Sequence, residues 1–260
     1  MTRHDRLSAL LDLVMERGSV HIDDIINELG VSAATARRDL DALAEQQLLT
    51  RTRGGAASNP TSSDLPLRYK ASRQTKEKQR IAQAAAALVR PSDVVGLNGG
   101  TTTTEVGREI AMLPILQGTN DAEVVVVTNA VNIANELTVR EPIRVVMTGG
   151  VVRSRSYELT GPLAQRILDD ITIDLLFLGV NAVEAVGGAA AHDEGEAAIN
   201  AALVSRSKRI VVVCDGTKIG RTAFARICAT ESIDTIISDE TADASTVQQL
   251  RDAGVDVKLV

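Results

Sequence analysis

The sequence predicts an α/β protein in two parts, a small N-terminal helical unit and a larger domain built on an open parallel sheet. Apolar residues recur at helical spacing early in the chain, and a polar, proline-broken stretch, Gly54–Pro66, then interrupts the pattern. Beyond it, continuous Val, Ile and Leu runs alternate with helical segments, which is typical of parallel strands covered on both faces. We therefore expect an N-terminal domain over residues 1–57, a linker over 58–74 and an α/β domain over 75–260.

Three short helices and a hairpin are predicted for the N-terminal domain. The first helix ends at Gly18 and the second at Gly30, because glycine commonly terminates helices. Ser32 has the side chain of a helix cap and begins the third helix. The polar stretch Thr50–Ala56, with its Gly-Gly pair, is typical of a small hairpin. The apolar stripes of the three helices are Leu7, Leu10, Leu11 and Val14, then Ile22, Ile25, Ile26 and Leu29, then Ala36, Leu40 and Leu43.

The second and third helices, joined by Leu29–Ser32, form a helix-turn-helix, a unit whose second helix lies in the major groove of duplex DNA. Opposite its apolar stripe this helix carries small residues, which allow close approach, and arginines, which bind guanine or phosphate. The helices alone fit a plain helical bundle equally well. The candidate DNA-binding residues are Ser32, Ala33, Ala34, Thr35, Arg37 and Arg38 on the helix, with Arg51 and Arg53 on the hairpin.

Six strands and the helices between them are predicted for the C-terminal domain. The strands are Val94–Leu97, Val124–Val127, Ile143–Met147, Leu175–Val180, Ile210–Cys214 and Thr235–Ser238. The helices are Lys76–Val89, Val131–Leu137, Leu163–Leu168 and Glu196–Ser205. An alternation of this kind predicts one open sheet.

Glycine, hydroxyl and amide groups follow four of these strands, at the sheet edge where open α/β sheets bind ligands. Glycines bring backbone N–H groups close to a phosphate, a helix N-terminus favours an anion, and threonine hydroxyls donate to its oxygens. Lys218 or Arg153 supplies the counter-charge, so the edge suits a phosphorylated polyol. Any one of these loops alone is more often a tight turn. The candidate residues are Asn98, Gly99, Gly100, Thr101, Thr102 and Thr103, then Thr128 and Asn129, then Gly149, Gly150 and Arg153, then Asp215 and Lys218.

The segment VSAATARRDLDAL, followed by RTRGGA, closely resembles the DeoR family of bacterial transcription regulators. In that family the recognition helix has the pattern Val-Ser-x-x-Thr-Ile-Arg-Arg-Asp-Leu and the wing ends in Gly-Gly-Ala. Two positions depart from the pattern, since Ala36 replaces Ile and Arg53 replaces His. We expect Asp39 to orient an arginine or to cap locally and not to contact a base. The matching residues are Val31, Ser32, Thr35, Arg37, Arg38, Asp39 and Leu40, with Gly54, Gly55 and Ala56.

The resemblance extends over nearly the whole chain, and it implies a winged helix-turn-helix followed by a sensor domain similar in fold to ribose-5-phosphate isomerase. It implies a ligand that is a phosphorylated sugar or a related metabolite, and a ligand contact for Glu196, which matches a family Glu. Asn98 and Asn200 depart from an acidic residue and a lysine of the family, which leaves the ligand's identity open. The segments in family order are Glu77–Ala82, Gly99–Thr103, Thr128–Asn129, Gly149–Gly150, Gly161–Pro162 and Asp215–Lys218.

From these features we expect a repressor of carbohydrate genes that binds a double-stranded DNA operator and a phosphorylated sugar or amino sugar, with no cofactor and no metal. Activation by the ligand is the other possibility. DNA half-sites are contacted by paired helices, so a symmetric homo-oligomer is expected, either a dimer or a tetramer.

A working sugar-phosphate isomerase is the alternative function. Aldose–ketose isomerisation needs a carboxylate base and a group that stabilises the oxyanion. The isomerases carry an Asp-Gly-Ala-Asp run after a central strand, and the corresponding stretch here, Leu178–Asn181, has no carboxylate. Because that stretch lacks a carboxylate, we do not expect an enzyme. Other candidate acids remain at Asp193, Glu194, Glu196 and Asp215.

Composition excludes other classes of protein. Hydrophobic residues are 44% and charged residues 24% of the 260 residues, as in ordinary globular proteins. No apolar run is long enough for a membrane span, and the N-terminus lacks the apolar core of a signal peptide, so a cytoplasmic location is expected. Aromatic residues are 2%, too few for the stacking platforms of single-stranded nucleic-acid binding.

The run His192–Glu196 is at most a weak metal site, because it holds one histidine among acids and no second His or Cys.

Charge is unevenly distributed. The net charge is −6, but residues 68–80 hold six basic residues against one acidic residue. Such a basic patch on an acidic chain is compatible with duplex DNA binding and also with an ordinary solvated helix end.

The chain has two cysteines, Cys214 and Cys228. We expect both to be reduced thiols that contribute to packing.

Overall fold

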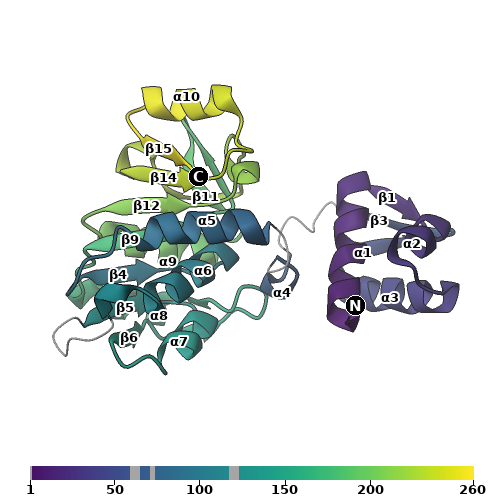
Figure 1. Cartoon of the computed structure of the whole chain (residues 1–260), viewed down its shortest axis with the longest axis horizontal. Coiled ribbons are helices and arrows are strands. Elements are labelled where there is room, and N and C mark those ends of the chain that lie inside the picture. Colours follow the sequence, from purple (N-terminus) through teal and green to yellow (C-terminus); the bar gives the residue numbers. More distant parts are fainter. Residues whose placement is uncertain (1, 59–64, 71–73, 117–122) are drawn as a thin grey trace. The chain divides into compact units, whose positions relative to one another are not determined.

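The computed structural model describes residues 2–58, 65–70, 74–116 and 123–260, and the chain divides into two units, Met1–Arg73 and Gln74–Val260 (Figure 1).

Helix caps and one apolar core form the first unit. Thr2 and Asp5 make a reciprocal capping box at the start of the first helix, and Gly30 ends the second in the left-handed region, at φ 63°. The apolar stripes of the three helices meet in one cluster of buried side chains, as the helical spacing predicts. The elements are α1 (Arg3–Arg17), β1 (Ser19–His21), α2 (Ile22–Leu29), α3 (Ala33–Glu45), β2 (Leu49–Thr52), β3 (Gly55–Ser58) and α4 (Leu67–Lys70).

The predicted hairpin is confirmed and belongs to a three-stranded antiparallel sheet of order β1-β3-β2. The strand β1 was not predicted, because three residues are too few for a periodic signal. Gly55 lets β3 approach β1, since a Cβ at this position would lie 2.0 Å from the carbonyl oxygen of Val20. The Gly-Gly pair therefore fixes how this hairpin, the wing, is attached to the helices.

Part of the predicted linker, 58–74, belongs instead to the first unit. Leu65 and Tyr69 are buried in its core, and the Tyr69 hydroxyl donates to Oε1 of Gln46 at 3.1 Å. The sequence did not predict that these two side chains are buried, because most of the residues around them are polar. Residues 59–64 and 71–73 of the predicted linker lie outside the described residues.

The second unit follows the predicted alternation of strands and helices. The predicted strands Val94–Leu97, Ile143–Met147 and Thr235–Ser238 are confirmed without change, and the others differ at their carboxyl ends. Its helices are α5 (Thr75–Ala86), α6 (Thr101–Ala111), α7 (Val131–Leu137), α8 (Pro162–Arg166), α9 (Glu194–Ser205) and α10 (Ala244–Asp252). Its strands are β4 (Val94–Leu97), β5 (Val124–Thr128), β6 (Ile143–Met147), β7 (Val151–Val152), β8 (Leu159–Thr160), β9 (Leu175–Gly179), β10 (Ala182–Glu184), β11 (Gly188–Ala191), β12 (Ile210–Val213), β13 (Ala225–Cys228), β14 (Thr235–Ser238) and β15 (Asp256–Leu259).

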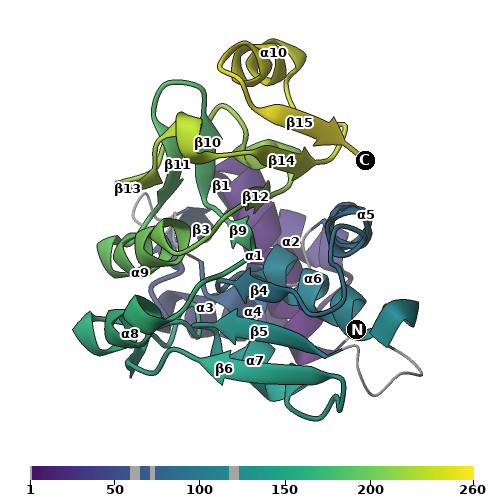
Figure 2. The ribbon, with the colours of Figure 1, turned by 90° about the vertical axis from the view of Figure 1, so that its left-hand side faces the viewer.

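Within the described residues, seven parallel strands form one sheet of order β15-β14-β12-β9-β4-β5-β6. Figure 2 shows the strands stacked in this order, with α5 and α6 on one face and α8 and α9 on the other. The strand order reverses between β4 and β9, because the chain runs from β4 outward to β6 and then returns to the other side of β4. A reversal of this kind is where open sheets leave a crevice for ligands.

Alternate residues of the central strands pack on opposite faces of the sheet. Leu175 and Phe177 belong to the cluster with α5, α6 and α7, while Leu176 and Leu178 belong to the cluster with α8, α9 and α10. A second, antiparallel sheet of order β10-β11-β13 completes the latter core. The strand β15 and this antiparallel sheet were not predicted, because their residues lack a continuous apolar run.

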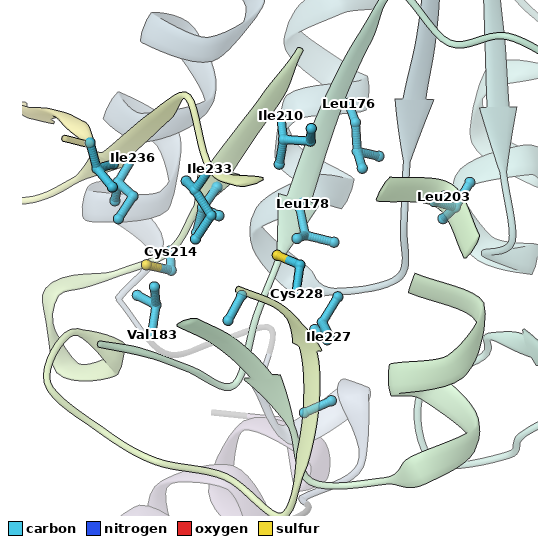
Figure 3. Close-up of a cluster of buried hydrophobic side chains, with 14 of the residues drawn as sticks. Leu176, Leu178, Val183, Leu203, Ile210, Cys214, Ile227, Cys228, Ile233 and Ile236 are labelled. Atoms are coloured by element: carbon cyan, nitrogen blue, oxygen red, sulfur yellow. The ribbon is translucent and has the colours of Figure 1, made fainter. Parts of the chain in front are cut away.

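The two cysteines are packing residues. Cys214 and Cys228 lie among Leu178, Val183 and Ile227 in this core (Figure 3) and are free thiols. Burial raises the pKa of the Cys214 thiol, and it also raises the pKa of Cys228. Both thiols are therefore uncharged at neutral pH and unreactive.

Candidate functional site

The third helix of the first unit, α3, has one buried and one exposed face. Ser32 caps it, accepting a hydrogen bond from the backbone N–H of Thr35 at 3.2 Å, as predicted. Ala36, Leu40 and Leu43 are fully buried. Of the candidate DNA-binding residues, Ser32, Ala34, Arg37, Arg38, Arg51 and Arg53 are exposed, and Ala33 and Thr35 are half-buried. The structure therefore presents the predicted set on an accessible surface.

Asp39 orients an arginine, as predicted, and that arginine is Arg6 of α1. Nε of Arg6 lies 2.5 Å from Oδ2 of Asp39, and Nη2 lies 3.2 Å from Oδ1. The hydrogen bond that Arg6 donates to Asp39 raises the pKa of Arg6 above its ordinary value. This two-pronged pair fixes α3 against α1 through the one buried acid of α3.

The arginines of the surface differ in what they contact. Arg51 is held within the unit, because its Nε lies 3.0 Å from Oδ1 of Asp41 and its Nη1 donates to the carbonyl of Gly55 at 2.9 Å. No ion pair involves Arg37, Arg38 or Arg53 within the described part of the chain. Three exposed guanidiniums thus remain available to an anionic partner.

In the second unit, the loop after β4 leads into α6 at the point where the strand order reverses. Asn98 joins the two diverging strands, because its Nδ2 donates to the carbonyl of Gly179 at 2.9 Å and its Oδ1 accepts from the backbone N–H of Gly179 at 2.7 Å. Both polar atoms of this candidate residue are therefore engaged in joining the end of β4 to the end of β9, a role that the sequence did not reveal.

The N-terminus of α6 is open to an anion. Gly100 precedes the helix with φ 147°, and no side chain caps the first turn. The hydroxyls of Thr103 and Thr104 donate back to the carbonyl of Gly100, at 3.1 and 2.6 Å. Those of Thr101 and Thr102 have no hydrogen-bond partner among the described residues. The N–H groups of a first helical turn lack partners inside the helix and point at what lies in front of it.

Glu158, which the sequence analysis missed, lies beside this loop. It is buried, its Oε2 accepts from Nδ2 of Asn129 at 2.9 Å, and a Cβ added to Gly99 would lie 2.1 Å from its Cγ. Thr128 directs its hydroxyl to its own loop, accepting from the N–H of Ala130 at 3.0 Å. Glu158 immediately precedes β8 in the hairpin that β7 and β8 form. No motif or strand pattern in the sequence marks this residue.

Arg153 is not the free counter-charge that the sequence predicts. Its Nε lies 3.1 Å from Oδ2 of Asp193 and its Nη1 lies 2.9 Å from Oε1 of Glu196. Asp193 also caps α9, accepting from the N–H of Glu196 at 3.0 Å. Two carboxylates thus surround one guanidinium. The predicted site residue Glu196 is brought next to Arg153, while Gly149 and Gly150 remain exposed in the loop after β6.

The loop Asp215–Lys218 is fixed by local hydrogen bonds. Asp215 accepts from the N–H of Thr217 at 3.1 Å, and Asp239, at the end of β14, accepts from the N–H of Gly216 at 2.8 Å. Lys218 is half-buried and has no ion pair within the described residues. Because β9 lies between β12 and β4, this loop is two strands away from residues Gly99–Thr103 after β4, the Gly-Thr loop, whereas the loops after β4, β5 and β6 are neighbours.

The described residues offer no group of three or more His, Cys, Asp or Glu side chains that could hold a metal ion. No helix in this part of the chain has the length and apolar character needed to cross a lipid bilayer.

A capped helix with exposed arginines on one unit, and an open helix N-terminus at a sheet crossover on the other, define a ligand-sensing DNA-binding regulator. The DeoR-like helix-turn-helix domain matches residues 6–62 and the DeoR C terminal sensor domain matches residues 73–240. The chain therefore belongs to the DeoR family of transcription regulators.

Several relatives match over nearly the full length of the chain. A protein of Escherichia coli O157:H7 named for repression of the aga operon is 35% identical, over 98% of this chain and 93% of that protein. The regulator GlpR of Haloferax volcanii is 33% identical, over 97% and 96%. The glycerol-3-phosphate regulon repressor of Escherichia coli K12 is 29% identical, over 100% of both. Among solved structures, ribose-5-phosphate isomerase A of Methanocaldococcus jannaschii aligns with a TM-score of 0.40 at 20% identity, over 54% of this chain and 52% of that one.

Proposed function

We propose that the protein represses genes of carbohydrate use, and that a phosphorylated sugar or amino sugar binds at the strand reversal of the second unit and weakens operator binding. One relative is named for repression of the aga operon and another for repression of the glycerol-3-phosphate regulon, and the second name supports a small phosphorylated ligand. Repression is the direction that those names support.

The open N-terminus of α6 at the strand reversal is the observation that carries this proposal. It combines a partial positive charge, free N–H groups and the hydroxyls of Thr101 and Thr102 in front of one turn of helix. Gly100, at φ 147°, lets the chain turn into the helix, while the space beside Gly99 is filled by Glu158. A phosphate is the ligand group whose charge and acceptor oxygens complement this set.

The remainder of the proposed site is rich in acceptors. Glu158 lies beside Gly99, and Arg153 of the β7–β8 hairpin contacts the carboxylates of Asp193 and Glu196. Oδ1 of Asn129 and of Asn200 are buried without a hydrogen-bond partner among the described residues. Sugar hydroxyls and an ammonium are donors that satisfy such acceptors. We therefore assign the phosphate to the α6 side and the polyol or amino sugar to the side of these acids. Gly149, Gly150, Thr128, Asp215 and Lys218 complete the proposed lining.

For DNA, the proposed contacts are α3 in the major groove, with Arg37 and Arg38 toward bases or phosphates and Arg53 of the wing toward the backbone. Arg51 contributes less directly, since Asp41 and the wing backbone already hold it. A symmetric oligomer presents two such helices to two half-sites. Ligand and operator then affect each other's affinity by the same factor.

Sensing is proposed here in place of catalysis. The loop after β9, where the isomerases carry their acids, begins with Val180 and Asn181, and Oδ1 of Asn181 accepts from the backbone N–H of His192 at 3.0 Å. An isomerase assay across pentose and hexose phosphates decides between the two functions, because sustained turnover contradicts a pure sensor.

Two substitutions test the proposal, with operator duplexes obtained by selection from random DNA. Arg38→Ala is expected to weaken operator binding by about 1–3 kcal/mol and to leave sugar-phosphate binding unchanged. Thr102→Val is expected to remove the response to the sugar phosphate that stabilises the wild type in a thermal-shift screen, while DNA binding persists. Arg140→Ala, an exposed arginine on the second unit, is the control for lost charge. Unchanged operator affinity in Arg38→Ala, or an unchanged ligand response in Thr102→Val, contradicts the corresponding assignment.

A further inference from the structure

Arg68, on the short helix α4, is an exposed cation that the first unit holds in a fixed position. Its Nη2 donates to Oε1 of Gln46 at 2.7 Å, and its guanidinium carbon lies 5.0 Å from the centre of the Tyr69 ring. The Tyr69 hydroxyl donates to the same oxygen of Gln46 at 3.1 Å, and Tyr69 is buried in the core of the unit. An amide and an aromatic ring therefore orient a guanidinium that stands at the surface.

The two groups that orient Arg68 do not neutralise it. An amide oxygen and an aromatic ring carry no net charge, and Arg68 forms no ion pair with an acid in the described part of the chain. Arg51 of the wing differs, because Asp41 already pairs with it. A cation that is fixed in place and keeps its charge loses little conformational entropy when it binds an anion.

Gln46 places Arg68 on one flank of α3. Its Nε2 donates to the carbonyl of Ala42 at 2.7 Å, so the side chain lies back along the last turn of the helix. At about 100° per residue, Gln46 lies about 80° from Arg38 around the helix axis, and Asp41 lies about 60° from Arg38 in the opposite direction. Asp41 forms the ion pair that holds the wing. Arg38 therefore lies between the wing on one flank and α4 on the other.

We propose that Arg68 is a DNA-binding residue and contacts the phosphate backbone beside the groove in which α3 lies. A helix in the major groove has a sugar–phosphate backbone along each of its flanks. The wing contacts one backbone and Arg68 the other. Gln46 accepts one of the five N–H donors of the guanidinium, and the remaining donors are directed to phosphate oxygens. This inference rests on the position of α3 in the proposed function and not on the sugar ligand.

The proposed contact adds affinity and no sequence preference. In a helix-turn-helix the N-terminal residues of the second helix contact the bases. Gln46 lies about 12 Å beyond Arg38 along the axis of α3, so Arg68 is displaced from the base contacts. Phosphate contacts fix the position of a protein on the duplex and are the same for every sequence.

Fluorescence anisotropy of the full chain with two duplexes, over a series of salt concentrations, tests the contact. One duplex is an operator obtained by selection from random DNA, and the other has the same length and a scrambled sequence. Arg68→Gln is expected to weaken binding to both duplexes by the same factor, about fivefold. It is also expected to reduce the slope of log affinity against log salt concentration by about one.

Two further variants separate charge from position. Arg68→Lys keeps the charge, so its salt slope is expected to equal that of the wild type. Arg80→Gln removes a charge from the same basic run at an exposed position of α5 in the second unit, and it is expected to bind DNA like the wild type.

Gln46→Glu neutralises Arg68 without replacing it. The new carboxylate still accepts from Arg68 and Tyr69, so the first unit is expected to keep its melting temperature. It also pairs with the guanidinium and repels phosphate, so binding to both duplexes is expected to weaken as in Arg68→Gln. Gln47→Glu adds the same charge at the next, exposed position and is the control, with a smaller effect expected.

An unchanged salt slope in Arg68→Gln overturns the proposal, including the case in which the melting temperature falls and the role is structural only. An effect on one duplex alone, or an equal effect of Arg80→Gln, also overturns it. Arg38→Ala separates this inference from the proposed function. Weaker operator binding in Arg38→Ala beside unchanged binding in Arg68→Gln overturns this inference alone, whereas unchanged operator binding in Arg38→Ala counts against the proposed position of α3.

Discussion

Nη1 of Arg153 lies 2.9 Å from Oε1 of Glu196, and this contact joins the β7–β8 hairpin to the first turn of α9. Asp193 holds the same guanidinium from the other side at 3.1 Å. The side chains are 40 and 43 residues from Arg153 in the chain. A cation already matched by two carboxylates attracts a phosphate less than a free cation does, so we expect the affinity of a ligand at the proposed site to depend on this balance of charge.

Replacement of Glu196 shifts that balance. We expect Glu196→Gln to tighten the binding of inorganic phosphate about fivefold, because one negative charge near the site is removed, an effect of about 1 kcal/mol. Affinity for the sugar phosphate is expected to fall relative to phosphate, since the carboxylate no longer accepts from the sugar. Titration calorimetry with both ligands measures this. Glu194→Gln removes the same charge from an exposed position on the same turn, and an equal effect there refutes a specific role for Glu196.

Asp39 is expected to stabilise the first unit through Arg6. Asp39→Asn leaves the half-buried guanidinium with a weaker partner, and we expect a loss of about 1–3 kcal/mol in the stability of that unit. Hydrogen exchange measured by mass spectrometry on α1 and α3 of the full chain reports it. Asp41→Asn is the control, because its exposed pair with Arg51 contributes at most about 1 kcal/mol. Equal exchange in both variants contradicts the prediction.

Gly55 is expected to tolerate no side chain. Its substitution by Ala places a Cβ 2.0 Å from the carbonyl oxygen of Val20, which is backbone and cannot turn aside, so β1 and β3 separate. We expect a loss of about 1–3 kcal/mol in the first unit and weaker operator binding. Phosphate binding by the second unit should be unchanged. A variant that binds the operator as tightly as the wild type shows that the wing accommodates the methyl group.

Asp239 makes the second unit sensitive to acid. Burial alone raises the pKa of a carboxyl, but hydrogen bonds from the Thr241 hydroxyl and from the backbone N–H groups of Gly216 and Thr241 lower the pKa of Asp239 below its ordinary value. The stabilisation is therefore complete above the ordinary carboxyl pKa of about 4 and is lost as the pH falls through the lower pKa of the folded state.

Asp239→Asn is accordingly expected to lower the free energy of unfolding at pH 7 and to lower it less at pH 3. Denaturant unfolding of both proteins at the two pH values gives the comparison. Glu240→Gln removes the neighbouring exposed charge, and no such pH-dependent difference is expected for it. The loop Asp215–Lys218 should lose order in the Asp239 variant, because the acceptor of the Gly216 N–H is weakened.

The sequence by itself determined the two-part organisation, the capped helix at Ser32 and the central strands. These features depend on local periodicity and on single capping or glycine residues, which neighbouring positions reveal. The exposure of the arginines of α3 followed from the same reasoning. Helical spacing that puts Ala36, Leu40 and Leu43 on the buried face puts Arg38 on the opposite face.

Only the tertiary structure decided the partners of the site residues. It placed Asn98 on the Gly179 backbone, Arg153 between two acids and Glu158 against Gly99, and it put Lys218 two strands away from the Gly-Thr loop. Side chains far apart in the chain meet through strand order and hairpin placement, and neither leaves a periodic signal in the sequence. The sequence therefore predicted which chemical groups follow the strand ends, while the fold determined which of them are already engaged by other residues.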